Sequence, residues 1–234
     1  MTRTRTLLLV LAAVSVAPLA SSAAPITVPS GLNPGDKYRL AFVTSTTRDA
    51  TSTNIADYNA FVSAVAAGQP ELAALATTWT AIASTATSGV KQNTDTDPNV
   101  STGFPIYQLD DTLVADDNAD LWDGLGNSPL RTSEDGTIHY SDGHEIWTGT
   151  NSAGSTAGST ALGGTSGDAR VGTLGSLGTA WINSFTNHPQ NTLRPMYAIS
   201  AELTVVPEPS TLALAAFGVV ALAAWGWRRK RSIR

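Results

Sequence analysis

The sequence contains no cysteine among its 234 residues. Disulfides, thiolate metal ligands and cysteine nucleophiles are therefore excluded. A chain of this length can still fold outside the cell without disulfides, because it can bury a core large enough to be stable. The lack of cysteine thus limits the possible chemistry and leaves the cellular compartment open.

Basic residues are scarce between the two ends of the chain. Seven of the 14 Lys and Arg lie in the terminal segments. Residues 25–205 keep seven basic residues against 18 acidic ones, which gives this segment a formal charge of −11. A surface with this excess of negative charge repels the phosphate backbone of a nucleic acid. We therefore expect no nucleic-acid partner.

Motifs with an established catalytic geometry are also missing. The sequence GSTAG has Thr156 where a nucleophile elbow needs serine, and HEIWT lacks the second histidine of a zinc motif. The acidic stretch 116–127 has Leu121 where an EF-hand loop needs glycine. We interpret its aspartates as turn and cap residues rather than calcium ligands. We expect no catalytic residue, no metal site and no cofactor.

The three histidines and the tryptophans leave weaker alternatives open. A hairpin at YSDG would place His139 and His144 on one face, where they could form a metal or acid–base pair, but ordinary strand-end residues are the simpler interpretation. The third histidine is His188. Tryptophans in apolar runs are expected in the core rather than as sugar-stacking platforms. They are Trp79, Trp122, Trp147 and Trp181.

The amino end has the layout of a secretory signal peptide. Arg3 and Arg5 precede an apolar run of ten residues, 7–16, and small residues follow through Ala24. Ten residues are too few to cross a bilayer as a helix. We therefore predict a signal peptide over residues 1–24 and an exported domain over residues 25–205.

The carboxyl end combines two prolines, an apolar run and a basic cluster. Residues 211–227 carry no charge and, as a helix, would measure about 25 Å, the lower limit for a membrane span. A cytoplasmic stop is expected from the basic residues that follow, namely Arg228, Arg229, Lys230 and Arg231. Pro207 and Pro209 favour an extended, accessible peptide just outside the membrane.

This tail resembles the PEP-CTERM sorting signal, which joins Pro-Glu-Pro, one hydrophobic span and a basic cluster. The sorting motif maps onto Val206, Pro207, Glu208 and Pro209, within a sorting segment 206–234. The resemblance implies a Gram-negative-type bacterium and an exosortase, a membrane cysteine transpeptidase, as partner. The protein would be anchored transiently in the inner membrane and then passed to the cell surface or the extracellular matrix. An anchor without cleavage is the alternative.

The exported part predicts an α+β fold. A strand is expected at 37–45, with Tyr38, Leu40 and Phe42 on one side, followed by a helix between Asn54 and Gly68. Further expectations are a short helix from 70, a strand at 79–85, a polar loop at 88–103, a hairpin at 106–115, a helix near 116–124, a strand at 144–150 and a final strand near 193–206. The glycine-rich stretch 151–178 is predicted to be a surface loop that buries little.

The order of these pieces resembles the endostatin-like branch of the C-type lectin-like fold. The matching stretches are FPIYQLDDTLVADDNADLWDGL, IWTGTNSAGS and MYAISAEL, within residues 37–203. The chain departs from that family in having no cysteine and no Glu-Pro-Asn or Trp-Asn-Asp motif. Calcium-dependent sugar binding is therefore not expected from the resemblance.

The leading hypothesis is a non-enzymatic protein of the cell surface or matrix that acts in adhesion or binds an extracellular polysaccharide. One alternative is a secreted polysaccharide hydrolase with a pair of carboxylates, drawn from Asp116, Asp123, Glu134 and Glu145. Another is a purely structural surface protein without a ligand.

Overall fold

The computed structural model describes residues 24–124, 126–139 and 144–206. The predicted membrane span 211–227, the basic stop and all but the last residue of the predicted signal peptide lie outside these ranges. Within the described residues, no helix is both long enough and apolar enough to cross a bilayer.

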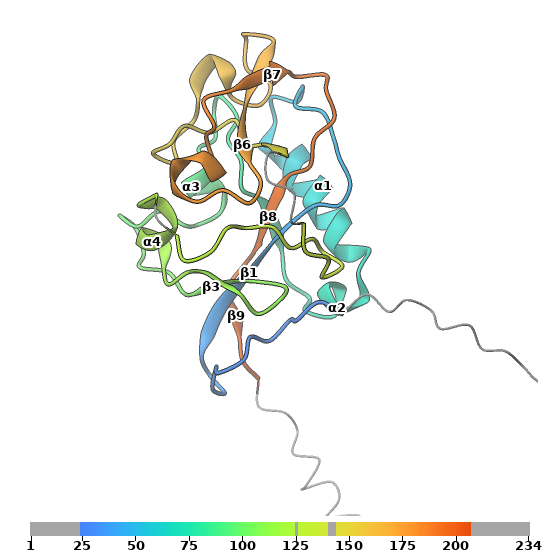
Figure 1. The fold of residues 1–234 in the computed structure, drawn as a ribbon, viewed down its shortest axis with the longest axis vertical. Coiled ribbons are helices and arrows are strands. Elements are labelled where there is room, and N and C mark those ends of the chain that lie inside the picture. Colours follow the sequence, from blue (N-terminus) through green and yellow to red (C-terminus); the bar gives the residue numbers. More distant parts are fainter. Residues whose placement is uncertain (1–23, 125, 140–143, 207–234) are drawn as a thin grey trace, which may run out of the picture.

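Two β-sheets and a few mostly short helices form an α+β architecture, as predicted (Figure 1). The larger sheet has the order β2-β8-β1-β3-β4, with β9 also paired to β1. Its strands are β1 (Lys37–Val43), β2 (Trp79–Ala81), β3 (Ile106–Gln108), β4 (Leu113–Ala115), β8 (Tyr197–Ser200) and β9 (Leu203–Thr204). The smaller sheet contains β5 (Glu145–Trp147), β6 (Asp168–Thr173) and β7 (Asn187–Pro189).

Strand β1 is the centre of the larger sheet and is buried on both faces. Its predicted inward residues Tyr38, Leu40 and Phe42 belong to one hydrophobic cluster. The opposite residues Ala41 and Val43 belong to a second cluster on the other face. Strand β1 pairs antiparallel with β8 and β9 and parallel with β3. Both clusters and all named strands lie within residues 24–206.

Helix α1 (Ile55–Ala67) covers the first cluster with Tyr58, Val62 and Ala66. The predicted cap is confirmed, because the side chain of Asn54 accepts a hydrogen bond of 3.1 Å from the backbone N–H of Ala56. The short helices are α2 (Pro70–Ala73), α3 (Val90–Asn93) and α4 (Asn118–Trp122), with 3₁₀ turns η1 (Gly158–Thr160) and η2 (Gly178–Trp181). Helix α3 corrects the prediction of a continuous polar loop over 88–103, and its buried Val90 anchors it to the second cluster.

The prediction of a surface loop at 151–178 is wrong. Strand β6 lies in this stretch and pairs with both β5 and β7. Leu162, Ala169 and Val171 are completely buried. A side chain at Gly163 would collide with the backbone carbonyl of Ser52, and the φ of Gly163 is +65°. Glycine here permits close backbone packing, whereas composition alone indicates a flexible loop.

The other predicted elements are present, some shorter than expected. Strands β3 and β4 form the expected hairpin, and Asp117 caps α4 by accepting hydrogen bonds from the backbone N–H groups of Ala119 and Asp120. Strand β2 ends at Ala81 rather than near 85. The C-type lectin-like resemblance stays a prediction.

Candidate functional site

An irregularity in the larger sheet opens a pocket beside β1. Ala41 pairs with Ile199 of β8, and Tyr38 pairs with Leu203 of β9. Between these two pairs, residues 39–40 of β1 face residues 200–202 of the returning chain. Three residues opposite two make a β-bulge, a feature that bends a strand and redirects side chains.

The side chain of Arg39 is held in place by a hydrogen bond to this bulge. Its Nε donates a hydrogen bond of 2.8 Å to the backbone carbonyl of Ser200. The hydroxyl of Ser200 in turn accepts from the backbone N–H of Leu40 at 2.9 Å and donates to the carbonyl of Ala201 at 2.7 Å. Arg39 is only 6% exposed, although it is a charged residue. Burial lowers the pKa of its guanidinium, and the nearby carboxylates of Asp95 and Glu202 partly offset this effect.

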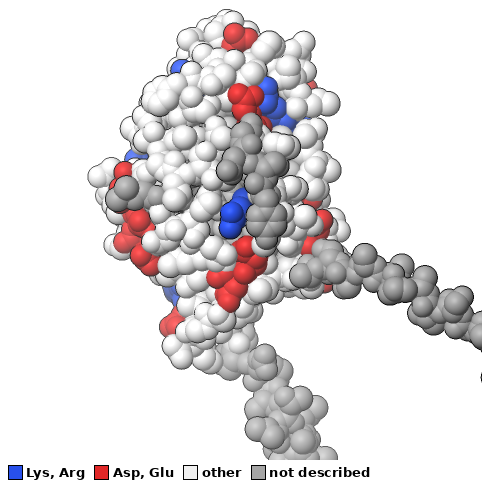
Figure 2. All heavy atoms as spheres, viewed as in Figure 1, with Lys and Arg blue, Asp and Glu red and all other residues white. Residues whose placement is uncertain are grey.

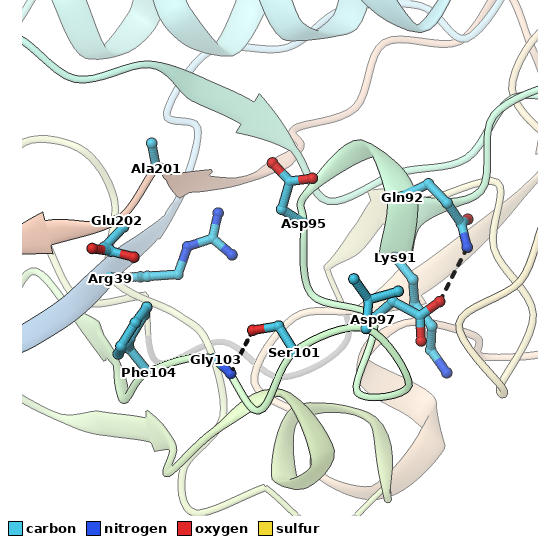
Figure 3. A pocket seen from close by; sticks show the side chains of 11 residues that line it. Arg39, Lys91, Gln92, Asp95, Asp97, Ser101, Gly103, Phe104, Ala201 and Glu202 are labelled. Atoms are coloured by element: carbon cyan, nitrogen blue, oxygen red, sulfur yellow. Dashed lines mark hydrogen bonds between the residues drawn. The ribbon is translucent and has the colours of Figure 1, made fainter.

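The guanidinium points into a pocket of about 540 Å³ (Figure 3). One wall comes from α3 and the turn after it, a second from the loop at 100–104, and a third from the connection between β8 and β9. Of the three guanidinium nitrogens of Arg39, only Nε has a hydrogen-bond acceptor among the described residues. The two terminal nitrogens therefore remain available toward the pocket. The lining residues include Arg39, Lys91, Asp95, Asp97, Phe104 and Glu202.

The two aspartates of the pocket have different roles. Asp97 shapes the loop, because its carboxylate accepts hydrogen bonds of 3.0 Å from both the backbone and the side-chain amide of Asn99. Asp95 is exposed and has a φ of +54°, in the left-handed region that aspartate tolerates better than most residues. No hydrogen bond to the Asp95 carboxylate is found within the described part of the chain. This carboxylate is therefore free to accept from a ligand.

The other charges near the pocket are already engaged. Glu202 forms an ion pair of 2.5 Å with Lys37, whose ammonium lies 5.1 Å from the centre of the Phe104 ring. The ammonium of Lys91 lies 5.5 Å from the Trp122 ring. Arg39 and Asp95 are thus two lining groups of opposite charge that can meet a ligand directly. Phe104, half-buried, adds an apolar surface.

This arrangement suits a ligand that both donates and accepts hydrogen bonds. A guanidinium only donates and an ionised carboxylate only accepts, whereas a hydroxyl does both. A ring that carries hydroxyl groups could accept from Arg39, donate to Asp95 and place its CH groups against Phe104. The pocket volume lies within the usual range for small-ligand sites.

Two of the carboxylates considered for a hydrolase, Glu134 and Glu145, lie in separate networks. Glu134 is 4% exposed and accepts hydrogen bonds from the backbone N–H of Ser45, at 2.8 Å, and from the Ser45 hydroxyl. Glu145 on β5 contacts Nε2 of His188 at 2.7 Å and Nη1 of Arg194 at 2.6 Å. These two glutamates are held by internal partners.

The two aspartates considered with them lie at opposite ends of α4. Asp116 precedes the helix, and its carboxylate accepts a hydrogen bond of 3.3 Å from the side-chain amide of Asn127. Asp123 is the residue that ends the helix. None of the four carboxylates lines the Arg39 pocket.

Of the histidines, His188 pairs with Glu145, which the sequence analysis did not anticipate. The YSDG hairpin predicted between His139 and His144 lies outside the described residues. In the ranges that the structure describes, no group of three or more His, Asp or Glu side chains is placed to hold a metal ion.

The tryptophans divide into two groups. Trp79 and Trp147 are core residues, 4% and 0% exposed, as expected. Trp122 and Trp181 are half-buried and pack against the second cluster, with ring centres 5.7 Å apart.

Of the sorting residues, Val206 is described and is 76% exposed. Pro207, Glu208 and Pro209 lie outside the described residues, and their individual roles stay predictions.

Sequence reasoning missed Arg39, although a signal was present. Arg39 shares its face of β1 with Ala41 and Val43, which both enter the second cluster. A charged residue on the inward face of an apolar strand is costly unless it serves a purpose. The bulge that supplies its acceptor depends on a pairing 161 residues away along the chain. Local patterns could not reveal that pairing.

The family model of the PEP-CTERM protein-sorting motif matches residues 205–231. This match confirms the predicted sorting motif. The motif implies an exported protein that is anchored transiently in the membrane and processed by an exosortase. No curated protein matches the chain.

Proposed function

We propose that this protein is a non-enzymatic component of the cell surface or extracellular matrix that associates with extracellular polysaccharide through the Arg39 pocket. The observation that carries the proposal is the pocket itself, with an available guanidinium, an available carboxylate and an aromatic ring. These three groups recur where proteins hold polyhydroxylated rings, because hydroxyls match the charged groups and CH faces match the ring.

The delivery route supports this assignment. A protein that leaves the inner membrane after removal of its tail meets the polymers outside the cell. Its acidic surface also fits this setting, since net charge keeps an exported protein soluble. Figure 2 shows several clusters of Asp and Glu on the face that is also viewed in Figure 1.

The non-enzymatic part of the proposal rests on the carboxylates. Glu134 and Glu145 are tied to internal partners, and the pocket presents Asp95 as its available carboxylate. Glycoside hydrolysis requires two carboxyl groups that flank the bond to be broken. A binding assay with glycans also tests the absence of enzymatic activity, because shortened oligosaccharides in the supernatant would support the hydrolase alternative instead.

A glycan array tests the proposal directly. The full chain, purified in detergent micelles, should bind at least one class of glycan. Phe104→Ala should weaken binding roughly tenfold, which corresponds to about 1.4 kcal/mol for one ring contact. Phe185→Ala is the matched control, because Phe185 is 72% exposed and does not line the pocket. Absence of binding to every glycan, or equal losses in both variants, would refute the proposal.

A further inference from the structure

We infer that the Arg39 pocket selects neutral polysaccharide and excludes acidic polysaccharide. This inference rests on the proposed function, since it specifies the ligand class of the same site. It follows from the balance of charge at the pocket, from the hydrogen-bonding capacity of its two available groups and from the charge of the surrounding domain.

The positive and negative charges at the pocket balance each other before a ligand binds. Glu202 is paired with Lys37, and Lys91 lies over Trp122. The carboxylate of Asp97 is engaged by Asn99. The three cations Arg39, Lys91 and Lys37 thus stand against three anions, Asp95, Asp97 and Glu202. Arg39 and Asp95 form no ion pair with each other among the described contacts. A neutral ligand preserves this balance.

A carboxylate on the ligand would upset that balance. It could accept two parallel hydrogen bonds from the guanidinium, which is the strongest contact that the pocket offers. It could not donate to Asp95, and its negative charge would face a second carboxylate at short range. Like charges brought together at an interface repel strongly, so the gain at Arg39 would be largely cancelled.

A hydroxyl pair avoids this conflict. One hydroxyl accepts from a terminal nitrogen of Arg39 while its neighbour donates to Asp95, and neither brings a charge. Figure 3 shows the guanidinium pointing toward the side of the pocket where Asp95 lies. The acidic domain, with seven basic against 18 acidic residues in 25–205, further repels a polyanion at low ionic strength.

The test compares neutral with carboxymethyl polymers in two pairs, and the two members of each pair share a backbone. The full chain in detergent micelles is titrated with dextran and with hydroxyethyl cellulose, and then with carboxymethyl dextran and carboxymethyl cellulose. We expect each carboxymethyl polymer to bind at least roughly tenfold more weakly than its neutral counterpart. Asp95→Asn should reduce this discrimination, because it removes the facing charge. Asparagine also tolerates the positive φ of residue 95, so the turn should be retained.

The control separates local from long-range repulsion. Asp168→Asn makes the same change in net charge at an exposed position outside the pocket, and it should leave the discrimination nearly intact. If the carboxymethyl polymers bind as tightly as the neutral ones, the inference is wrong while the proposed function survives. If Asp168→Asn relaxes the discrimination as much as Asp95→Asn does, the pocket is not its source, and the inference is again wrong. If no polymer and no arrayed glycan binds, both are overturned.

Discussion

Replacing Leu162 by alanine should destabilise the domain strongly, although its sequence surroundings indicate a loop. Leu162 lies within the glycine-rich stretch 151–178 and is completely buried in the first hydrophobic cluster. Its backbone N–H donates to the carbonyl of Ser84 at 3.0 Å, which fixes the segment against the chain that follows β2. The side chain is therefore a core residue, and its truncation removes buried contacts.

The expected loss follows from the atoms removed. Leucine to alanine deletes three carbons, which corresponds to about 2.4 kcal/mol of transfer free energy at about 0.8 kcal/mol per carbon. The cavity left behind adds to this value, so we expect a loss of about 3 kcal/mol in the free energy of unfolding. With a urea m-value of about 2 kcal/mol per molar, the midpoint of unfolding should fall by about 1.5 M.

The assay is urea unfolding of the segment 25–206, followed by tryptophan fluorescence. Leu177→Ala is the matched control, since Leu177 is 50% exposed and should lose less than about 1 kcal/mol. Equal small shifts for both variants would mean that the glycine-rich stretch is a loose surface loop after all, and the reasoning from burial would be refuted.

Two further predictions concern pH and processing. Burial opposes ionisation of Asp135, but hydrogen bonds from the Ser133 hydroxyl and the Thr137 backbone N–H outweigh it and lower the carboxyl pKa below its usual value. The ionised carboxylate thus stabilises the fold fully above the pKa of the unfolded chain, near 4, and this stabilisation is lost as the pH falls through the lower pKa of the folded protein. In urea unfolding, Asp135→Asn should be less stable than wild type at pH 7 and as stable as wild type below the folded pKa. A stability difference that stays constant with pH would contradict this. Replacing Pro207, Glu208 and Pro209 together by alanine should leave export intact and block removal of the tail. Immunoblotting of cell fractions would detect this block as a persistent longer species. Maturation to the normal shorter species would show that the motif is not what the exosortase recognises.

Elements defined by local patterns could be predicted from the sequence. Three examples are the alternation in β1, the Asn54 cap and Gly68 end of α1, and a cap of α4 at Asp116 or Asp117, of which the structure uses Asp117. Each depends on neighbours within a few residues. The sorting motif at 205–231 belongs to the same group, because a linear peptide of prolines, apolar residues and basic residues carries its meaning in its order.

Local order along the chain was therefore enough to predict the sorting motif, the α+β class, both ends of α1 and the start of α4. The burial of the glycine-rich stretch and the contacts of Arg39 appear only in the folded chain. Gly163 allows close approach to the carbonyl of Ser52, and the acceptor of Arg39 belongs to Ser200. Both partners are far away along the chain, and a contact of that kind exists only after the strands have paired.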